Sequence, residues 1–300
     1  MENAIKYYYS ISPLNLQKLD NGYIFDSDYE KYYLELSNFD EKRLKEVYEL
    51  NRRMISNNIL VHEIILNSFK QLVTIIDDKP YVLMRINVNL DKKIDLKDIS
   101  YFQYSSKFLI NEKGSAPIPW NIKWSKKIDH YEQQATEIGK RYPIAMEAFN
   151  YFVGIAENAV MYVNEFSTSS PTLSYCHIRP ITNALEFYNP FNLIIDYKVR
   201  DVSEYLKFKF FYEDFDFNEF SKYLYNSNLT GVDIQYFYAR MLFPTYFFDV
   251  FEQVMETKID EKKISYIVKK ISDYESLIRN LYYFLNKYVN LDKIDWLIRN

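Results

Sequence analysis

The spacing of apolar residues changes near residue 87, and this change constrains the fold more than any other feature of the chain. Up to that point, short runs of β-branched and aromatic residues are separated by polar turn residues, which is typical of β-strands. The predicted strands cover residues 23–25, 31–36, 72–76 and 81–86, and Asn21-Gly22 favours a hairpin turn. Residues 40–54 carry the apolar stripe of a helix, with Asp40 as its N-cap. This segment therefore predicts an antiparallel sheet with one helix packed on it.

A polar connector is predicted at residues 87–97, and beyond it the apolar residues recur with the period of helices. The predicted helices span residues 118–140, 143–163, 201–213, 217–226, 232–256 and 260–290. Two short apolar strands are predicted, one around His177 and one at residues 191–196. Trp120 and Trp124 lie on the apolar face of the first helix, so we expect them in the core. The chain is thus predicted to be an α+β protein with a small antiparallel-sheet lobe, residues 1–88, and a larger, mainly helical lobe, residues 89–300.

Composition excludes several classes of function. Glycine occurs only five times, at isolated positions, whereas glycine-rich phosphate-binding loops need closely spaced glycines. Basic and acidic residues nearly balance at 37 and 41, and no basic stripe indicates a nucleic-acid partner. One cysteine, Cys176, excludes an internal disulfide framework and a thiolate zinc site. Because no signal peptide or membrane-spanning apolar run is present, we expect a soluble, cytoplasmic protein without membrane insertion.

Two segments carry a family resemblance. Residues 174–183 read Ser-Tyr-Cys-His-Ile-Arg-Pro-Ile-Thr-Asn, and residues 193–197 read Leu-Ile-Ile-Asp-Tyr. In order and spacing they resemble the catalytic loop, His-Gly-Asp-x-x-x-x-Asn, and the metal-binding Ile-Asp-aromatic motif of the aminoglycoside phosphotransferase and choline kinase-like superfamily. Residues 200–206 resemble the Asp-opened helix that follows this motif in the superfamily. The motif spacing and residues 239–247 look most like its spore-coat-associated, kinase-like branch of the CotS and YutH type. The resemblance covers nearly the whole chain and implies a bilobal, protein-kinase-like fold.

The resemblance breaks down at positions that carry phosphoryl transfer, which needs a phosphate-binding lysine, a catalytic aspartate and metal-binding Asn and Asp side chains. Glu35 stands where the resemblance places the lysine, and its negative charge would repel phosphate. Arg179 stands where it places the catalytic aspartate, and arginine stays protonated at physiological pH. Asn183 falls one residue before the metal-binding asparagine, whose position is held by Ala184.

The matching residues are His177, Asp196 and Asp201, and of these only Asp196 would keep a chemical role, at the residual metal position. If that role is lost, we expect Arg179 to form an ion pair with Asp196 or Asp201, and Glu35 to face solvent or pair with a nearby lysine or arginine. Asp196 could otherwise ligate a metal ion. Cys176 and His177 could suggest a nucleophile and its base, but neighbours in a strand point to opposite faces, so we interpret both as buried structural residues.

Two functions remain open, besides a generic interaction module without nucleotide ancestry. A non-catalytic kinase-like protein, or pseudokinase, would act through protein–protein interaction, and the resemblance implies spore coat proteins as partners, a location in the cytoplasm or spore coat, and no cofactor. A divergent small-molecule phosphotransferase would instead use Asp196 with ATP and magnesium. We favour the pseudokinase because Glu35, Arg179 and Ala184 replace residues that the reaction requires.

Overall fold

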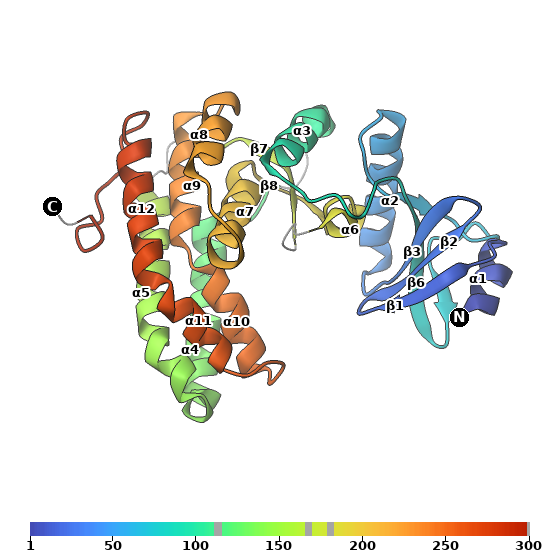
Figure 1. Ribbon diagram of the computed structural model, residues 1–300, viewed down its shortest axis with the longest axis horizontal. Coiled ribbons are helices and arrows are strands. Elements are labelled where there is room, and N and C mark those ends of the chain that lie inside the picture. The colour runs from blue at the N-terminus through green and yellow to red at the C-terminus, as the bar shows by residue number, and fades with distance from the viewer. Residues whose placement is uncertain (111–115, 166–169, 179–182, 299–300) are drawn as a thin grey trace. The chain divides into compact units, whose positions relative to one another are not determined.

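The computed structural model describes residues 1–110, 116–165, 170–178 and 183–298. The chain forms two compact units (Figure 1). The first unit comprises Met1–Asn111 and His177–Ile194, and the second comprises Glu112–Cys176 and Ile195–Asn300. Residues 89–111 and 177–194, which the sequence placed in the second lobe, thus belong to the first compact unit.

The first unit is built on a six-stranded antiparallel sheet with the order β1-β2-β3-β6-β4, in which β5 also pairs with β6. Its strands are β1 (Leu14–Leu19), β2 (Gly22–Ser27), β3 (Glu30–Leu36), β4 (Glu63–Ile65), β5 (Thr74–Ile76) and β6 (Lys79–Ile86). Asp28-Tyr29 and Asp77-Asp78 form two-residue turns in which every residue has a positive φ, as type I′ hairpins require. The predicted sheet is confirmed, but β1 and β4 were not predicted, and β6 begins at Lys79, two residues before the predicted strand 81–86.

Helices α1 (Glu2–Tyr9) and α2 (Glu41–Ser56) cover opposite faces of this sheet (Figure 1). Tyr32 and Leu34 of β3 pack in the cluster that includes residues of α1, whereas Tyr33, between them, packs in the cluster that includes residues of α2. This division follows from the alternation of side chains along a strand. Asp40 is the predicted N-cap of α2, and its carboxylate accepts a hydrogen bond from the Arg43 amide at 2.7 Å. The helix on the sheet is confirmed, and α1 is an addition.

The rest of the first unit is short helices and the ends of two strands. They are α3 (Leu96–Ser106), η1 (Lys107–Leu109), α6 (Ala184–Phe187) and η3 (Pro190–Asn192). The predicted connector at 87–97 ends where α3 begins, because Asp95 and Asp98 form a capping box there. β7 (Leu173–His177) and β8 (Leu193–Tyr197) pair as a two-stranded sheet, and the chain passes from one unit to the other within these strands.

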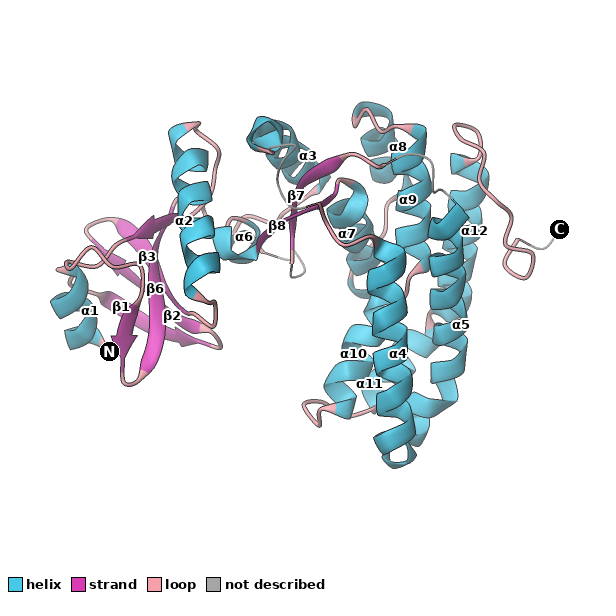
Figure 2. Ribbon diagram, turned by 180° about the vertical axis from the view of Figure 1, so that it is seen from behind, coloured by secondary structure: helices cyan, strands magenta, loops and turns pink. Residues whose placement is uncertain are grey.

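The second unit is helical (Figure 2). Its elements are α4 (Trp120–Ile138), η2 (Gly139–Arg141), α5 (Pro143–Glu165), α7 (Val199–Tyr212), α8 (Phe217–Asn226), α9 (Gly231–Leu242), α10 (Thr245–Met255), α11 (Lys262–Lys269) and α12 (Ile271–Leu285). Helix α5 packs against α4 and α9, and α9 packs against α7 and α12. Trp120 and Trp124 are buried, as predicted.

Two long predicted helices are each divided in two. Residues 232–256 form α9 and α10, because Pro244 cannot donate the hydrogen bond that would continue the first helix. Residues 260–290 form α11 and α12, which meet at Lys270, whose ammonium group donates to the Phe210 and Phe211 carbonyls. Across the described ranges, no helix is long and apolar enough to cross a membrane.

Candidate functional site

The residues singled out from the sequence fall into both units. Glu35, His177 and Asn183 belong to the first, and Asp196 belongs to the second, so each group is described within its own unit. Arg179 lies outside the described residues. Its ion pair with Asp196 or Asp201 therefore stays a prediction.

Glu35 is buried in the centre of the first unit's sheet. It lies in β3, a strand paired on both sides, and only 4% of its surface is exposed. The Asn189 side-chain amide donates to its carboxylate at 2.8 Å, and the Asn189 carbonyl oxygen accepts from the Phe191 amide. Glu35 therefore does not face solvent, the first of its two expected arrangements, because Asn189 contacts it within this part of the sheet. Its pairing with a lysine or arginine stays a prediction.

His177 and Asn183 both support the short helix α6. The His177 ring stacks on Phe187 with 4.6 Å between centroids, and its Nε2 lies 2.8 Å from the Phe187 carbonyl oxygen. The Asn183 side chain caps the helix by accepting from the Glu186 amide at 2.9 Å. Ala184, at the position where the resemblance places a metal-binding asparagine, is buried. These contacts of His177 and Asn183 stabilise the segment that contains α6.

Cys176 lies in the second unit and is fully buried. Burial raises the pKa of its thiol well above the ordinary value, and the negative charges of Asp201 and Asp196 raise it further. Its Sγ lies 3.5 Å from the Tyr197 carbonyl oxygen. A thiol that stays protonated is a poor nucleophile, which agrees with the structural reading of this residue.

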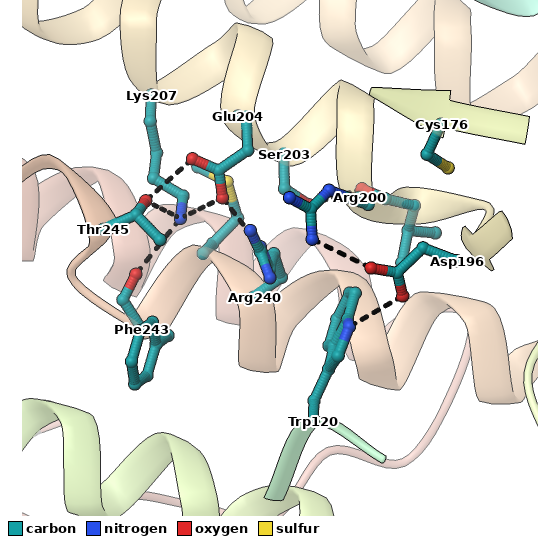
Figure 3. A network of polar contacts seen from close by, with 12 residues as sticks. Trp120, Cys176, Asp196, Arg200, Ser203, Glu204, Lys207, Arg240, Phe243 and Thr245 are labelled. Atoms are coloured by element: carbon teal, nitrogen blue, oxygen red, sulfur yellow. Dashed lines mark hydrogen bonds and ion pairs between the residues drawn. The ribbon is translucent and has the colours of Figure 1, made fainter. Parts of the chain in front are cut away.

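Asp196 is surrounded by hydrogen-bond donors of the second unit (Figure 3). Its Oδ1 accepts from the Trp120 indole at 2.9 Å and from the Tyr197 amide at 2.8 Å. Its Oδ2 accepts from Nη1 of Arg200 at 2.8 Å. This ion pair is buried, with side-chain exposures of 10% for Arg200 and 4% for Asp196. Asp196 thus joins the end of β8 to the first turn of α7 and to the first residue of α4.

A second group of charged side chains lies next to Trp120 (Figure 3). The Arg240 guanidinium lies 4.9 Å from the centroid of the Trp120 ring, and its Nε donates to Glu204 at 2.7 Å. Glu204 also accepts from the Lys207 ammonium at 2.9 Å and from the Thr245 hydroxyl at 2.7 Å. These contacts bring α4, α7, α9 and α10 together around one carboxylate.

In this second group, burial and nearby charges shift the pKa values of Glu204 and Lys207 in opposite directions. Burial alone would raise the pKa of Glu204, but the charges of Lys207 and Arg240 hold it well below its usual value. Burial lowers the pKa of Lys207 to about 8, even though Glu204 acts in the opposite direction. The sequence reasoning missed this network. The three-residue spacing of Glu204 and Lys207 on a helix was a usable signal, whereas nothing local pointed to Arg240 or Thr245.

The fold places the chain among kinase-like proteins. It superposes with a TM-score of 0.68 on an aminoglycoside phosphotransferase from Alicyclobacillus acidocaldarius, at 9% identity, covering 96% of this chain and 97% of that one. It superposes with a TM-score of 0.53 on the choline kinase LicA from Streptococcus pneumoniae, at 10% identity, covering 92% and 99%. At these identities the likeness concerns the fold alone, and it confirms the predicted bilobal, kinase-like architecture.

Sequence comparison identifies the family. Residues 2–288 match the family described as "Spore coat putative kinase YutH", and the chain belongs to that family. A relative, the endospore coat-associated protein YutH of Bacillus subtilis (strain 168), is 23% identical over 206 residues. That match spans 59% of this chain and 61% of the relative, about three fifths of its length. The resemblance drawn from the sequence is therefore confirmed at the level of family and fold.

Proposed function

We propose that this kinase-like protein is non-catalytic and acts by binding other proteins of the spore coat. The observation that carries the proposal is the set of hydrogen bonds that Asp196 accepts, because this residue stands at the metal position of the superfamily's motif. Its two carboxylate oxygens accept from an indole, a backbone amide and a buried guanidinium. All of these donors come from the protein itself.

Asp196 in this arrangement does not fit a magnesium ligand. Mg²⁺ needs near-ideal octahedral oxygen coordination, and a carboxylate ligand must offer it a free lone pair. Oδ2 faces the positive charge of Arg200 at 2.8 Å, so a divalent cation would meet repulsion there unless Arg200 moved away. We therefore derive no phosphoryl-transfer step through ATP and magnesium.

Glu35 supports the same proposal from the first unit. A lysine at this position would bring a positive charge to the nucleotide phosphates, whereas Glu35 brings a negative one. Its carboxylate is buried and accepts from Asn189, so it has a structural partner within its own unit. At the positions where the superfamily binds phosphate and metal, Glu35 and Asp196 thus contact other residues of their own units.

Protein binding is supported by the family's coat association and by a surface on α3. Tyr101 and Tyr104 lie one turn apart on α3, and Phe108 lies in the adjoining η1; the three residues are 68%, 69% and 57% exposed. Aromatic side chains are enriched at protein interfaces, where they contribute much of the binding free energy. We name these three residues the α3 aromatic stripe and propose that it contributes to partner binding.

Nucleotide binding is tested by thermal shift. ATP with magnesium should raise the melting temperature no more than tripolyphosphate with magnesium, because a ligand stabilises only as far as it occupies the native state. Tripolyphosphate controls for binding of phosphate groups alone. An additional rise with ATP that disappears in Asp196→Asn would contradict the proposal and support a divergent phosphotransferase.

Partner binding is tested by co-purification from sporulating cells of the source organism. The triple variant of the α3 aromatic stripe, with serine at each position, should lose coat proteins that the wild type retains. Tyr225→Ser is a matched control, because Tyr225 is also exposed but belongs to the second unit. Equal recovery with wild type and the stripe variant would remove α3 from the interface, and the absence of any coat protein would contradict the proposed function itself.

A further inference from the structure

The α3 aromatic stripe is accompanied by two exposed lysines. Lys97 lies one turn before Tyr101 on α3. Lys107 lies in η1, and its ammonium group is 4.4 Å from the centroid of the Tyr104 ring. An ammonium group at this distance is attracted to the face of the ring, so positive charge and aromatic surface are presented together.

These two lysines are not neutralised by carboxylates of the described residues. The acidic side chains of α3 and of its N-cap make other contacts. Asp98 is paired with Lys92, and Asp95 accepts from the backbone amides at the start of the helix. No described residue forms an ion pair with Lys97 or Lys107. The stripe therefore fits a partner surface that is both acidic and aromatic.

A surface of this kind is present in the second unit, at residues 212–219. Their sequence is Tyr-Glu-Asp-Phe-Asp-Phe-Asn-Glu, in which three aromatic residues alternate with acidic ones and no basic residue occurs. The segment connects the last residue of α7 to the first turn of α8. We name residues 212–219 the acidic aromatic segment.

The rings of the acidic aromatic segment are fixed by contacts with neighbouring helices. The Phe215 ring lies 6.5 Å, between centroids, from Phe210 of α7 and equally far from Phe217. Phe217 in turn lies 5.2 Å from Phe284 of α12. Phe215 and Phe217 remain half-buried, and Tyr212 is 52% exposed. The segment thus holds aromatic surface in place while part of it stays open to a partner.

Two carboxylates of this segment are available for a partner. Asp214 is exposed and Glu219 is half-buried, and neither forms an ion pair with any described residue. The other two acidic residues have contacts within the unit, since Glu213 is paired with Lys209 and Asp216 caps α8. Two unpaired carboxylates beside aromatic rings complement the two unpaired lysines of the stripe.

We propose that the α3 aromatic stripe of one copy of the chain binds the acidic aromatic segment of a second copy. Lys97 and Lys107 then face Asp214 and Glu219 at the rim of the contact, and the aromatic rings of both surfaces form its centre. The contact joins two different surfaces, so it is made twice in a closed dimer or repeated along an open assembly. This inference rests on the proposed role of the stripe in partner binding, and it names another copy of the chain as a partner.

Self-association is tested by measuring the mass of the full chain in solution with sedimentation velocity over a range of protein concentrations. In about 0.1 M sodium chloride, the mass should rise with concentration above that of a single chain. In about 1 M sodium chloride the association should weaken, because salt screens the attraction between exposed charges.

Charge reversal tests which surfaces meet. Lys97→Glu with Lys107→Glu, and separately Asp214→Lys with Glu219→Lys, should each weaken self-association about tenfold or more, because two attractive pairs become repulsive. An equimolar mixture of the two double variants should associate again. In the mixture, the unchanged acidic aromatic segment of the first variant meets the unchanged stripe of the second.

A matched control separates the position of the charges from the total charge. Lys6→Glu with Lys18→Glu changes the net charge by the same amount as the stripe variant, at two other exposed lysines of the first unit. This control should associate as the wild type does. The melting temperatures of all three double variants should stay close to that of the wild type, because surface substitutions have small effects on folding.

Carbodiimide cross-linking of the wild type gives a measurement that needs no variant. The reagent joins a lysine directly to a carboxylate, and a mixture of light and isotopically heavy chains distinguishes links between copies from links within one copy. Links from Lys97 or Lys107 to Asp214 or Glu219 should contain one light and one heavy peptide.

Three results would overturn the inference: a wild type that stays monomeric at every concentration, a mixture of the two reversal variants that does not associate, or links between copies confined to other residues. The proposed function is decided by a separate result. Coat proteins that the wild type retains and the serine variant of the stripe loses would support it whether or not the chain associates with itself.

Discussion

Replacement of Arg200 by methionine tests how Asp196 is stabilised. The change removes the guanidinium and keeps a side chain of similar length in the core. Removing one partner of a buried ion pair costs about 3–5 kcal/mol, because the remaining charge stays buried. Here Trp120 and the Tyr197 amide still donate to Oδ1, so we expect a loss near the lower end, about 3 kcal/mol.

A double-mutant cycle separates the ion pair from other effects of the substitution. Asp196→Asn keeps an oxygen that can accept from Trp120 but removes the negative charge. If charge attraction is the main term, the double variant should lose less stability than the sum of the two single variants, with a coupling of roughly 2 kcal/mol. Lys209→Met is the control on the same helix, because the Lys209–Glu213 pair is more exposed and should contribute at most about 1 kcal/mol.

Urea unfolding followed by tryptophan fluorescence is the appropriate measurement. The three tryptophans of the chain, Trp120, Trp124 and Trp296, all belong to the second unit, so the signal reports the unit that contains the ion pair. The slope of free energy against urea should stay constant, so that a changed midpoint reports stability. An Arg200→Met variant as stable as Lys209→Met, or additive single variants, would refute the reasoning that Arg200 compensates the buried charge of Asp196.

Three further predictions concern the stability of the first unit, and each is measured as unfolding monitored by far-UV circular dichroism. Gly22→Ala should cost roughly 2 kcal/mol or more, because a Cβ at this position would lie 2.1 Å from the Leu34 carbonyl oxygen; an unchanged melting temperature would contradict that contact. Burial lowers the pKa of His62 to about 4, so the unfolded state binds more protons between pH 6.5 and 4, and stability should fall as pH drops through this window. His62→Gln should flatten the dependence, and an equally steep decline in this variant would assign it to other groups. Asp40→Ala should cost about 1 kcal/mol through loss of the hydrogen bond to Arg43, and no loss would show that this cap is dispensable.

Local sequence patterns were sufficient for most of the secondary structure. The strand around Tyr33 and the helix that starts after Asp40 were predicted from alternation, apolar spacing and a capping side chain, all of which act within a few residues. Helix α1 was not predicted, because its buried residues are only Ile5 and Tyr9, and two apolar positions are too few to show a helical period. The division at Pro244 was readable in principle, since proline ends a helical hydrogen-bond ladder wherever it occurs.

The partners of the candidate site residues could not be derived in this way. The sequence motifs predicted the positions of Glu35 and Asp196 in a kinase-like fold. They did not predict which residues donate hydrogen bonds to the two carboxylates. Asn189 reaches Glu35 across 154 positions of sequence, and Trp120 reaches Asp196 across 76. Such contacts depend on how whole helices and strands pack, and packing minimises buried charge and empty volume over the complete core. The residue types along the chain therefore determined the elements and the family, while tertiary packing alone decided which donors surround each buried carboxylate.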